Sequence, residues 1–166
     1  ATVTSTSNYV AWGEAASGDL IVDPGMWSID NFGDKAICLI VDGEVFEWNS
    51  AATDATNSRA TIITNAPTAS RHMLVSTPDR HLCVFGVNPQ GSTTFDRTTI
   101  RFASQESLSQ WDAAITNTAG SQKLGTGTNI EAAKKGRGQI YIWTDVDLYG
   151  MQFVGPPFTF SFSLLG

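Results

Sequence analysis

The acidic residues that could do chemistry in this chain stand in pairs at predicted turns. Asp145 and Asp147 share one turn, and Asp30 and Asp34 flank another. Glycoside hydrolysis needs two carboxyl groups about 5 to 9 Å apart, on opposite sides of a sugar. Acids at hairpin tips more often accept hydrogen bonds from backbone N–H groups. The pairs therefore favour structural caps, and we expect no catalytic residue and no enzymatic activity.

The two histidines do not make a metal site by spacing. His72 and His81 fall on neighbouring predicted strands, with Asp79 as the only nearby acid. A zinc site needs at least three converging ligands. We therefore expect solvent-facing or capping histidines and no bound metal.

The cysteines and the glycine-rich stretches also lack a reactive pattern. Cys38 and Cys83 each lie inside an apolar run, which favours two buried side chains over a disulfide between neighbouring strands. The chain has no G-x-S-x-G, P-loop or G-x-G-x-x-G motif. The run GTGT at 125–128 precedes a predicted strand and not a helix, so it lacks the helix dipole that phosphate binding uses. No cofactor is expected.

Aromatic residues raise the alternative of carbohydrate binding. Trp12, Trp27 and Trp111 are the candidates for stacking on a sugar ring. Trp48 and Trp143 end similar predicted strands, and packing between sheets explains them more simply. Recognition of host surface glycans is therefore kept as the alternative function.

The elements that position these residues are predicted to be short strands. From Gly138 the chain runs through an aromatic and β-branched strand, a polar turn and a second strand, and Pro156 and Pro157 then end the ladder. In FTFSFSLL, at 158–165, large apolar residues alternate with hydroxyl residues, which indicates a half-buried strand. The last 29 residues thus predict a meander.

This meander recurs along the chain. Similar units are predicted at 26–64, 72–124 and 128–165, and their second strands are marked by Ile37, Val84 and Ile140. A repeat of about 50 residues predicts four-stranded antiparallel meanders arranged as β-propeller-like blades, with a β-sandwich as the alternative.

Three such units are too few for the usual ring of four to eight blades. We therefore expect residues 1–166 to be a single all-β region and a fragment of a larger propeller-like protein, with the other blades supplied by further sequence or by another chain.

Three minor elements complete the expectation. Residues 9–12 and 20–22 are predicted to be short strands, and the stretch 104–114 a single helical turn, because Ser104 or Ser107 can cap it.

The composition argues against DNA docking and membrane insertion. The formal net charge of −6 is opposite in sign to that of phosphate-backbone binders, although an acidic wall past which DNA slides remains compatible. No run of about 18 apolar residues could span a bilayer.

Several short motifs occur in a specific order: Asp79-Arg80-His81, Ile100-Arg101-Phe102 followed by the 104–106 turn, the 117–120 loop, and the 143–145 hairpin. From Trp27 to Leu165 this order resembles a family of virion structural proteins of tailed bacteriophages, common in marine phages and related prophages. The members of that family are considerably longer than this chain.

The resemblance implies an all-β or propeller-like module of a tail, such as a nozzle, hub or adaptor. It implies assembly in the host cytoplasm and localisation in the virion. The implied partners are other copies of the chain and neighbouring virion or tail proteins, with DNA only as passing cargo and with no membrane. It implies no catalytic residues.

Overall fold

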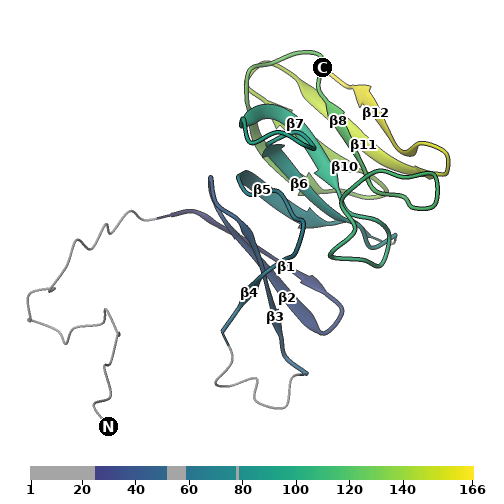
Figure 1. Cartoon of the computed structure of the whole chain (residues 1–166). Coiled ribbons are helices and arrows are strands. Elements are labelled where there is room, and N and C mark those ends of the chain that lie inside the picture. Colours follow the sequence, from purple (N-terminus) through teal and green to yellow (C-terminus); the bar gives the residue numbers. More distant parts are fainter. Residues whose placement is uncertain (1–24, 52–58, 78) are drawn as a thin grey trace, which may run out of the picture.

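The structure is a computed structural model that describes residues 25–51, 59–77 and 79–166, and within these ranges the regular elements are all strands. The described part holds twelve strands (Figure 1). In chain order they are β1 Trp27–Phe32, β2 Lys35–Ile40, β3 Val45–Asn49, β4 Thr61–Ile62, β5 Ser70–Val75, β6 Leu82–Val87, β7 Asp96–Phe102, β8 Gly120–Lys123, β9 Ile130–Lys135, β10 Ile140–Thr144, β11 Leu148–Gly155 and β12 Thr159–Leu164.

In this described part the strands form three antiparallel sheets of four, each ordered as in the sequence. We call them the first sheet (β1 to β4), the middle sheet (β5 to β8) and the third sheet (β9 to β12). Ile37, Val84 and Ile140 lie in β2, β6 and β10, the second strand of each sheet. The predicted all-β class of propeller-like four-stranded meanders is confirmed.

The middle sheet packs between the other two. Every residue of β6 is buried, so this strand is covered on both faces. One core lies between the first and middle sheets and is built from Phe32, Ile37, Leu39, Val45, Ile63, Met73, Val75, Leu82, Val84, Val87, Ala103 and Trp111. The other lies between the middle and third sheets and is built from Leu74, Cys83, Phe85, Ile100, Phe102, Leu124, Ile130, Ile140, Ile142, Tyr149, Met151 and Phe160.

The first strands of the sheets converge at one edge of the stack. The Asp30 carboxylate in β1 accepts a hydrogen bond of 2.7 Å from the Val75 N–H in β5. The same oxygen lies 2.6 Å from the Lys135 ammonium in β9. One carboxylate therefore ties together the leading strands of all three sheets, which is the radial arrangement expected of blades around an axis.

The predicted helical turn at 104–114 is wrong, because the described residues there form turns and bends. Side chains hold this loop: Gln105 N–H donates to Thr118 Oγ1 at 2.8 Å, and the Trp111 indole N–H donates to the Leu108 carbonyl at 2.7 Å. Serine, threonine and asparagine compete with helical backbone bonds in this way. The strands predicted at 9–12 and 20–22 lie outside the described residues.

Candidate functional site

A row of polar side chains, buried Asp79 and His81 and half-buried Thr118, crosses the contact between the middle and third sheets. His81 lies just before β6 and is fully buried. Its Nδ1 is 2.7 Å from Asp79 Oδ2, and its Nε2 is 3.0 Å from Thr118 Oγ1. Burial raises the pKa of Asp79, but the hydrogen bonds from His81 and Ser76 outweigh it and leave that pKa below its usual value.

Thr118, His81 and Asp79 are arranged like the nucleophile, base and acid of a catalytic triad. Their surroundings, however, fit a structural role. The His81 ring packs against Phe153 and Phe160, at centroid distances of 5.4 and 5.1 Å. Thr118 Oγ1 already accepts the Gln105 N–H, and His81 has no exposed surface for a substrate to reach. The expectation of a solvent-facing or capping histidine is therefore wrong for His81.

The carboxylates considered for glycoside chemistry do not face one another across a cleft. Asp145 accepts hydrogen bonds from the Thr128 N–H at 2.8 Å and the Thr128 hydroxyl at 2.6 Å, which lower its pKa. It thus caps the chain before β9, as predicted for a hairpin-tip acid. Asp30 is engaged by Lys135 at the inner edge, whereas Asp34 lies in a separate groove.

That Asp30–Lys135 contact predicts a pH dependence. Burial raises the pKa of Asp30, but Lys135 and the Val75 and Asn31 N–H groups outweigh burial and lower it below its usual value. Because the folded pKa is depressed, ionised Asp30 stabilises the fold above about pH 4, and this contribution is lost as the pH falls through the folded pKa. Asp30→Asn should therefore melt below the wild type at about pH 6, with a smaller difference near pH 2. Circular dichroism melts at both pH values check this, and a gap that does not change with pH would contradict it.

Of the tryptophans considered for sugar stacking, Trp111 is only 1% exposed and cannot present its ring. Trp27 is 57% exposed, and Trp12 lies outside the described residues. Within the described chain Trp143 does not pack between sheets as predicted, since this side chain is 40% exposed on the far side of the third sheet. Cys83 is buried as predicted and Cys38 is half-buried, and both thiols are free. Burial raises the pKa of both thiols.

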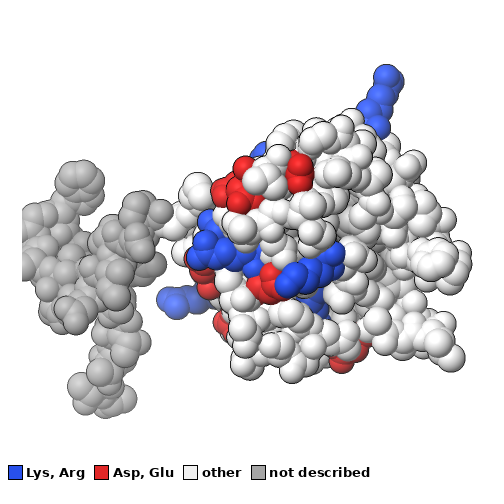
Figure 2. All heavy atoms as spheres, turned by 90° about the horizontal axis from the view of Figure 1, so that it is seen from above, with Lys and Arg blue, Asp and Glu red and all other residues white. Residues whose placement is uncertain are grey.

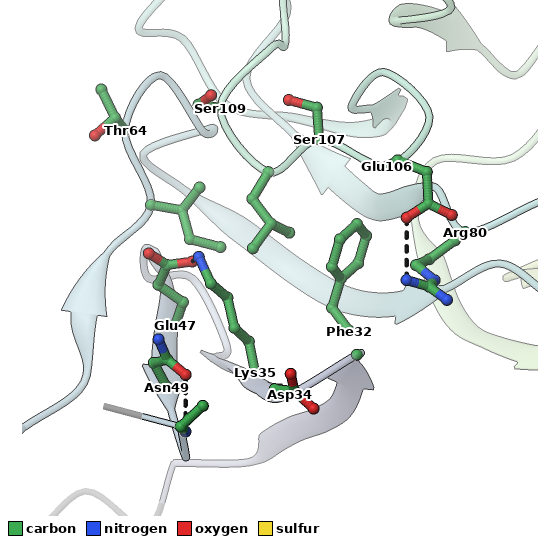
Figure 3. Close-up of a pocket in the computed structure, with 14 residues that line it drawn as sticks. Phe32, Asp34, Lys35, Glu47, Asn49, Thr64, Arg80, Glu106, Ser107 and Ser109 are labelled. Carbon is green, nitrogen blue, oxygen red and sulfur yellow. Dashed lines mark hydrogen bonds and ion pairs between the residues drawn. The ribbon is translucent and has the colours of Figure 1, made fainter. Parts of the chain in front are cut away.

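An open groove of about 620 Å³ lies where the β1–β2 hairpin meets the 105–109 loop (Figure 3). Four of its charged side chains are paired: Lys35 lies 2.8 Å from Glu47, and Arg80 lies 3.0 Å from Glu106. Asp34 also lines the groove. Phe32, between these pairs, is only 9% exposed. The groove therefore offers no free aromatic platform, and its three acidic and two basic side chains give it only a small excess of negative charge.

The surface seen from above in Figure 2 carries most of its charges in one region, with acidic and basic side chains side by side and a largely uncharged area next to them. Such mixing does not make the continuous basic stripe that a phosphate backbone requires. Among the described residues, no group of three His, Cys, Asp or Glu side chains converges as a metal site would need. In the same part of the chain there is no helix long and apolar enough to cross a membrane.

The most unusual surface is the face of the first sheet that points away from the middle sheet. The strand register places nine side chains on it: Trp27, Ile29, Asn31, Ala36, Cys38, Ile40, Phe46, Trp48 and Ile62. Trp27, Ile29 and Ile62 are 57, 72 and 54% exposed. We call this surface the outer face of the first sheet. Exposed apolar patches of this kind are typical of interaction sites.

The opposite end of the stack presents a more polar surface. The register of the third sheet places Ala132, Lys134, Tyr141, Trp143, Leu148, Gly150, Gln152, Ser161 and Ser163 on its far side. The Tyr141 and Trp143 rings lie together near its centre, 6.1 Å apart. We call this surface the outer face of the third sheet. An aromatic centre with a polar rim is the usual anatomy of a protein interface.

Sequence reasoning missed these two faces, although one signal was present. The strand Lys35–Ile40 is nearly all apolar, which is typical of strands covered on both faces. Comparison of the chain with protein-family models, curated proteins and solved structures found no match.

Proposed function

We propose that this protein is a non-enzymatic structural component of a tailed-phage virion, placed in the tail as a nozzle, hub or adaptor, and that it acts by assembly. The observation that carries the proposal is the outer face of the first sheet, where Trp27, Ile29 and Ile62 are each more than half exposed. Side chains of this kind favour burial by about 1.5 to 3 kcal/mol each, so a soluble monomer gains nothing by displaying them. A protein partner is the simplest reason for them.

The order of sequence motifs from Trp27 to Leu165 supports the choice of a virion protein. The chemistry of the described residues is consistent with it, because Asp145 caps the chain before β9, Asp30 pairs with Lys135, and His81 is buried. A net charge of −6 suits a wall that DNA passes without binding.

Mass spectrometry of gradient-purified, protease-treated phage particles from cells that carry the gene tests the proposal. Peptides from the chain should be present in the particles in a fixed ratio to the portal protein. If the chain appears only in the soluble fraction of the lysate, the proposal is wrong.

Carbohydrate binding remains the second candidate, because Trp27 is exposed enough to stack on a sugar. Its register partner Ile40 and the next residue on the same face, Ile29, provide no polar side-chain groups for hydrogen bonds to a glycan. Binding on a glycan array that Trp27→Ala abolishes would favour this candidate over assembly.

A further inference from the structure

We propose that the outer face of the first sheet binds the outer face of the third sheet of a second copy of the chain, so that two copies close one ring of six sheets. This inference rests on the proposed structural function and names its partner and its surface. It begins from the exposed faces at the two ends of the stack.

The first sheet has the side chains of a sheet that is covered on both faces by neighbouring sheets. In β2, Ile37 and Leu39 are buried against the middle sheet, whereas Cys38 and Ile40, which alternate with them, point the other way. The strand β6 of the middle sheet, LCVFGV, has the same two-sided apolar pattern and is buried on both faces. β2 therefore resembles β6 in its apolar pattern, but the first sheet has a neighbouring sheet on only one face in the described structure.

The stack also defines which face belongs in that position. Each sheet follows its predecessor with the same strand order and with its first strand at the shared inner edge. If the succession continues beyond the first sheet, the sheet that covers its outer face must do so with the face that points away from that sheet's own predecessor. The outer face of the third sheet is a face of this kind, and the described chain leaves it exposed.

The two faces are chemically compatible. No charged side chain occurs among the described strand residues on the outer face of the first sheet. The contact therefore leaves no charge from this face buried without a partner. Tyr141, Trp143 and Leu148 supply an apolar centre on the other side. Lys134 lies on the edge strand β9 and stays at the rim, where its ammonium can reach water.

The area of the two outer faces and the number of sheets also fit a second copy. With strands about 4.8 Å apart and a rise of about 3.3 Å per residue, a sheet of this size presents roughly 400 Å² on each face. Two contacts in a closed pair then bury about 1,600 Å² over four faces, the usual size of a stable interface. Three sheets from each of two copies make six, which lies within the usual four to eight blades of a ring.

Native mass spectrometry of the 166-residue chain over a concentration series tests the proposal. We expect twice the chain mass of 17.8 kDa. The double variant Ile29→Glu/Ile62→Glu should weaken pairing at least about tenfold, because it places two charges in the apolar contact. Trp143→Glu should do the same from the opposite face. Ile115→Glu, at a fully exposed loop position outside both faces, is the matched control and should pair normally.

Mixing the two disrupted variants tests the head-to-tail contact. Each variant keeps one intact face, so the mixture should form pairs although each variant alone is monomeric. If like faces bound each other, Trp143→Glu would stay paired on its own, and the inference would be overturned. The substituted side chains are 40 to 72% exposed, and circular dichroism melts check that the variants fold.

A wild-type chain that stays monomeric at every concentration also overturns the inference, but it leaves the proposed function in place if virions contain the chain. Pairing without any incorporation into virions contradicts the proposed function alone.

Discussion

Replacing His81 with alanine should lower the free energy of unfolding by about 3 to 5 kcal/mol, because a buried pair would lose one partner. Asp79 would keep its Ser76 hydrogen bond but lose the His81 ring that lies 2.7 Å away. The space between Phe153 and Phe160 would become a cavity as well. For a chain of this length the melting temperature should fall by about 10 °C. Urea unfolding and a thermal melt measure both quantities.

The other histidine is the matched control. His72 is half-buried in β5, and its Nε2 has no hydrogen-bond partner in the described structure. We expect His72→Ala to change stability by less than about 1 kcal/mol. Equal effects of the two substitutions would show that the His81 row does not hold the middle and third sheets together.

Replacing Phe85 with alanine should destabilise the protein by about 3 to 5 kcal/mol, since large aromatic residues leave a cavity that a packed core fills poorly. Phe85 has no exposed surface and lies in β6, where the middle sheet packs against the third. Chemical denaturation followed by tryptophan fluorescence measures the loss.

Phe158 provides the comparison for this substitution. It precedes β12 and is 78% exposed, so Phe158→Ala should stay within about 0.5 kcal/mol of the wild type. A small effect at Phe85, similar to that at Phe158, would mean that the middle sheet is not packed as described.

The strands could be predicted because the alternation of apolar and polar residues and the residues typical of turns are local features of the sequence. The hairpin between β2 and β3 turns at Asp42, which adopts a φ of 61°, next to Gly43. The equivalence of Ile37, Val84 and Ile140 followed from the same local signals, repeated three times. Such patterns also showed that Asp145 would be a cap, since an acid at a hairpin tip lies near free N–H groups.

What the sequence could not predict depends on contacts between distant residues. The burial of His81 requires Thr118, which is 37 positions away, and rings from the third sheet. The stretch around Leu108 and Trp111 has helical spacing, but hydrogen bonds to the Thr118 hydroxyl and within the loop take the place of helical ones. The exposed position of Trp143 depends on which sheets have neighbours, and a single sequence does not contain that information.

The sheets differ in how many of their faces are buried, and this difference connects the fold to assembly. The middle sheet is buried on both faces, whereas each end of the stack exposes one face. On this account the cores stabilise the stack, the His81 row fixes its spacing, and the end faces determine what it binds.

Hydrogen exchange at low and high protein concentration tests that account most directly. The amides of β6 should exchange slowly at both concentrations, because that strand is already covered on both faces. Those of β1, β2, β10 and β11 should become more protected as concentration rises, since the outer faces then bury each other. Unchanged exchange in these four strands at concentrations where the chain is paired would contradict the account.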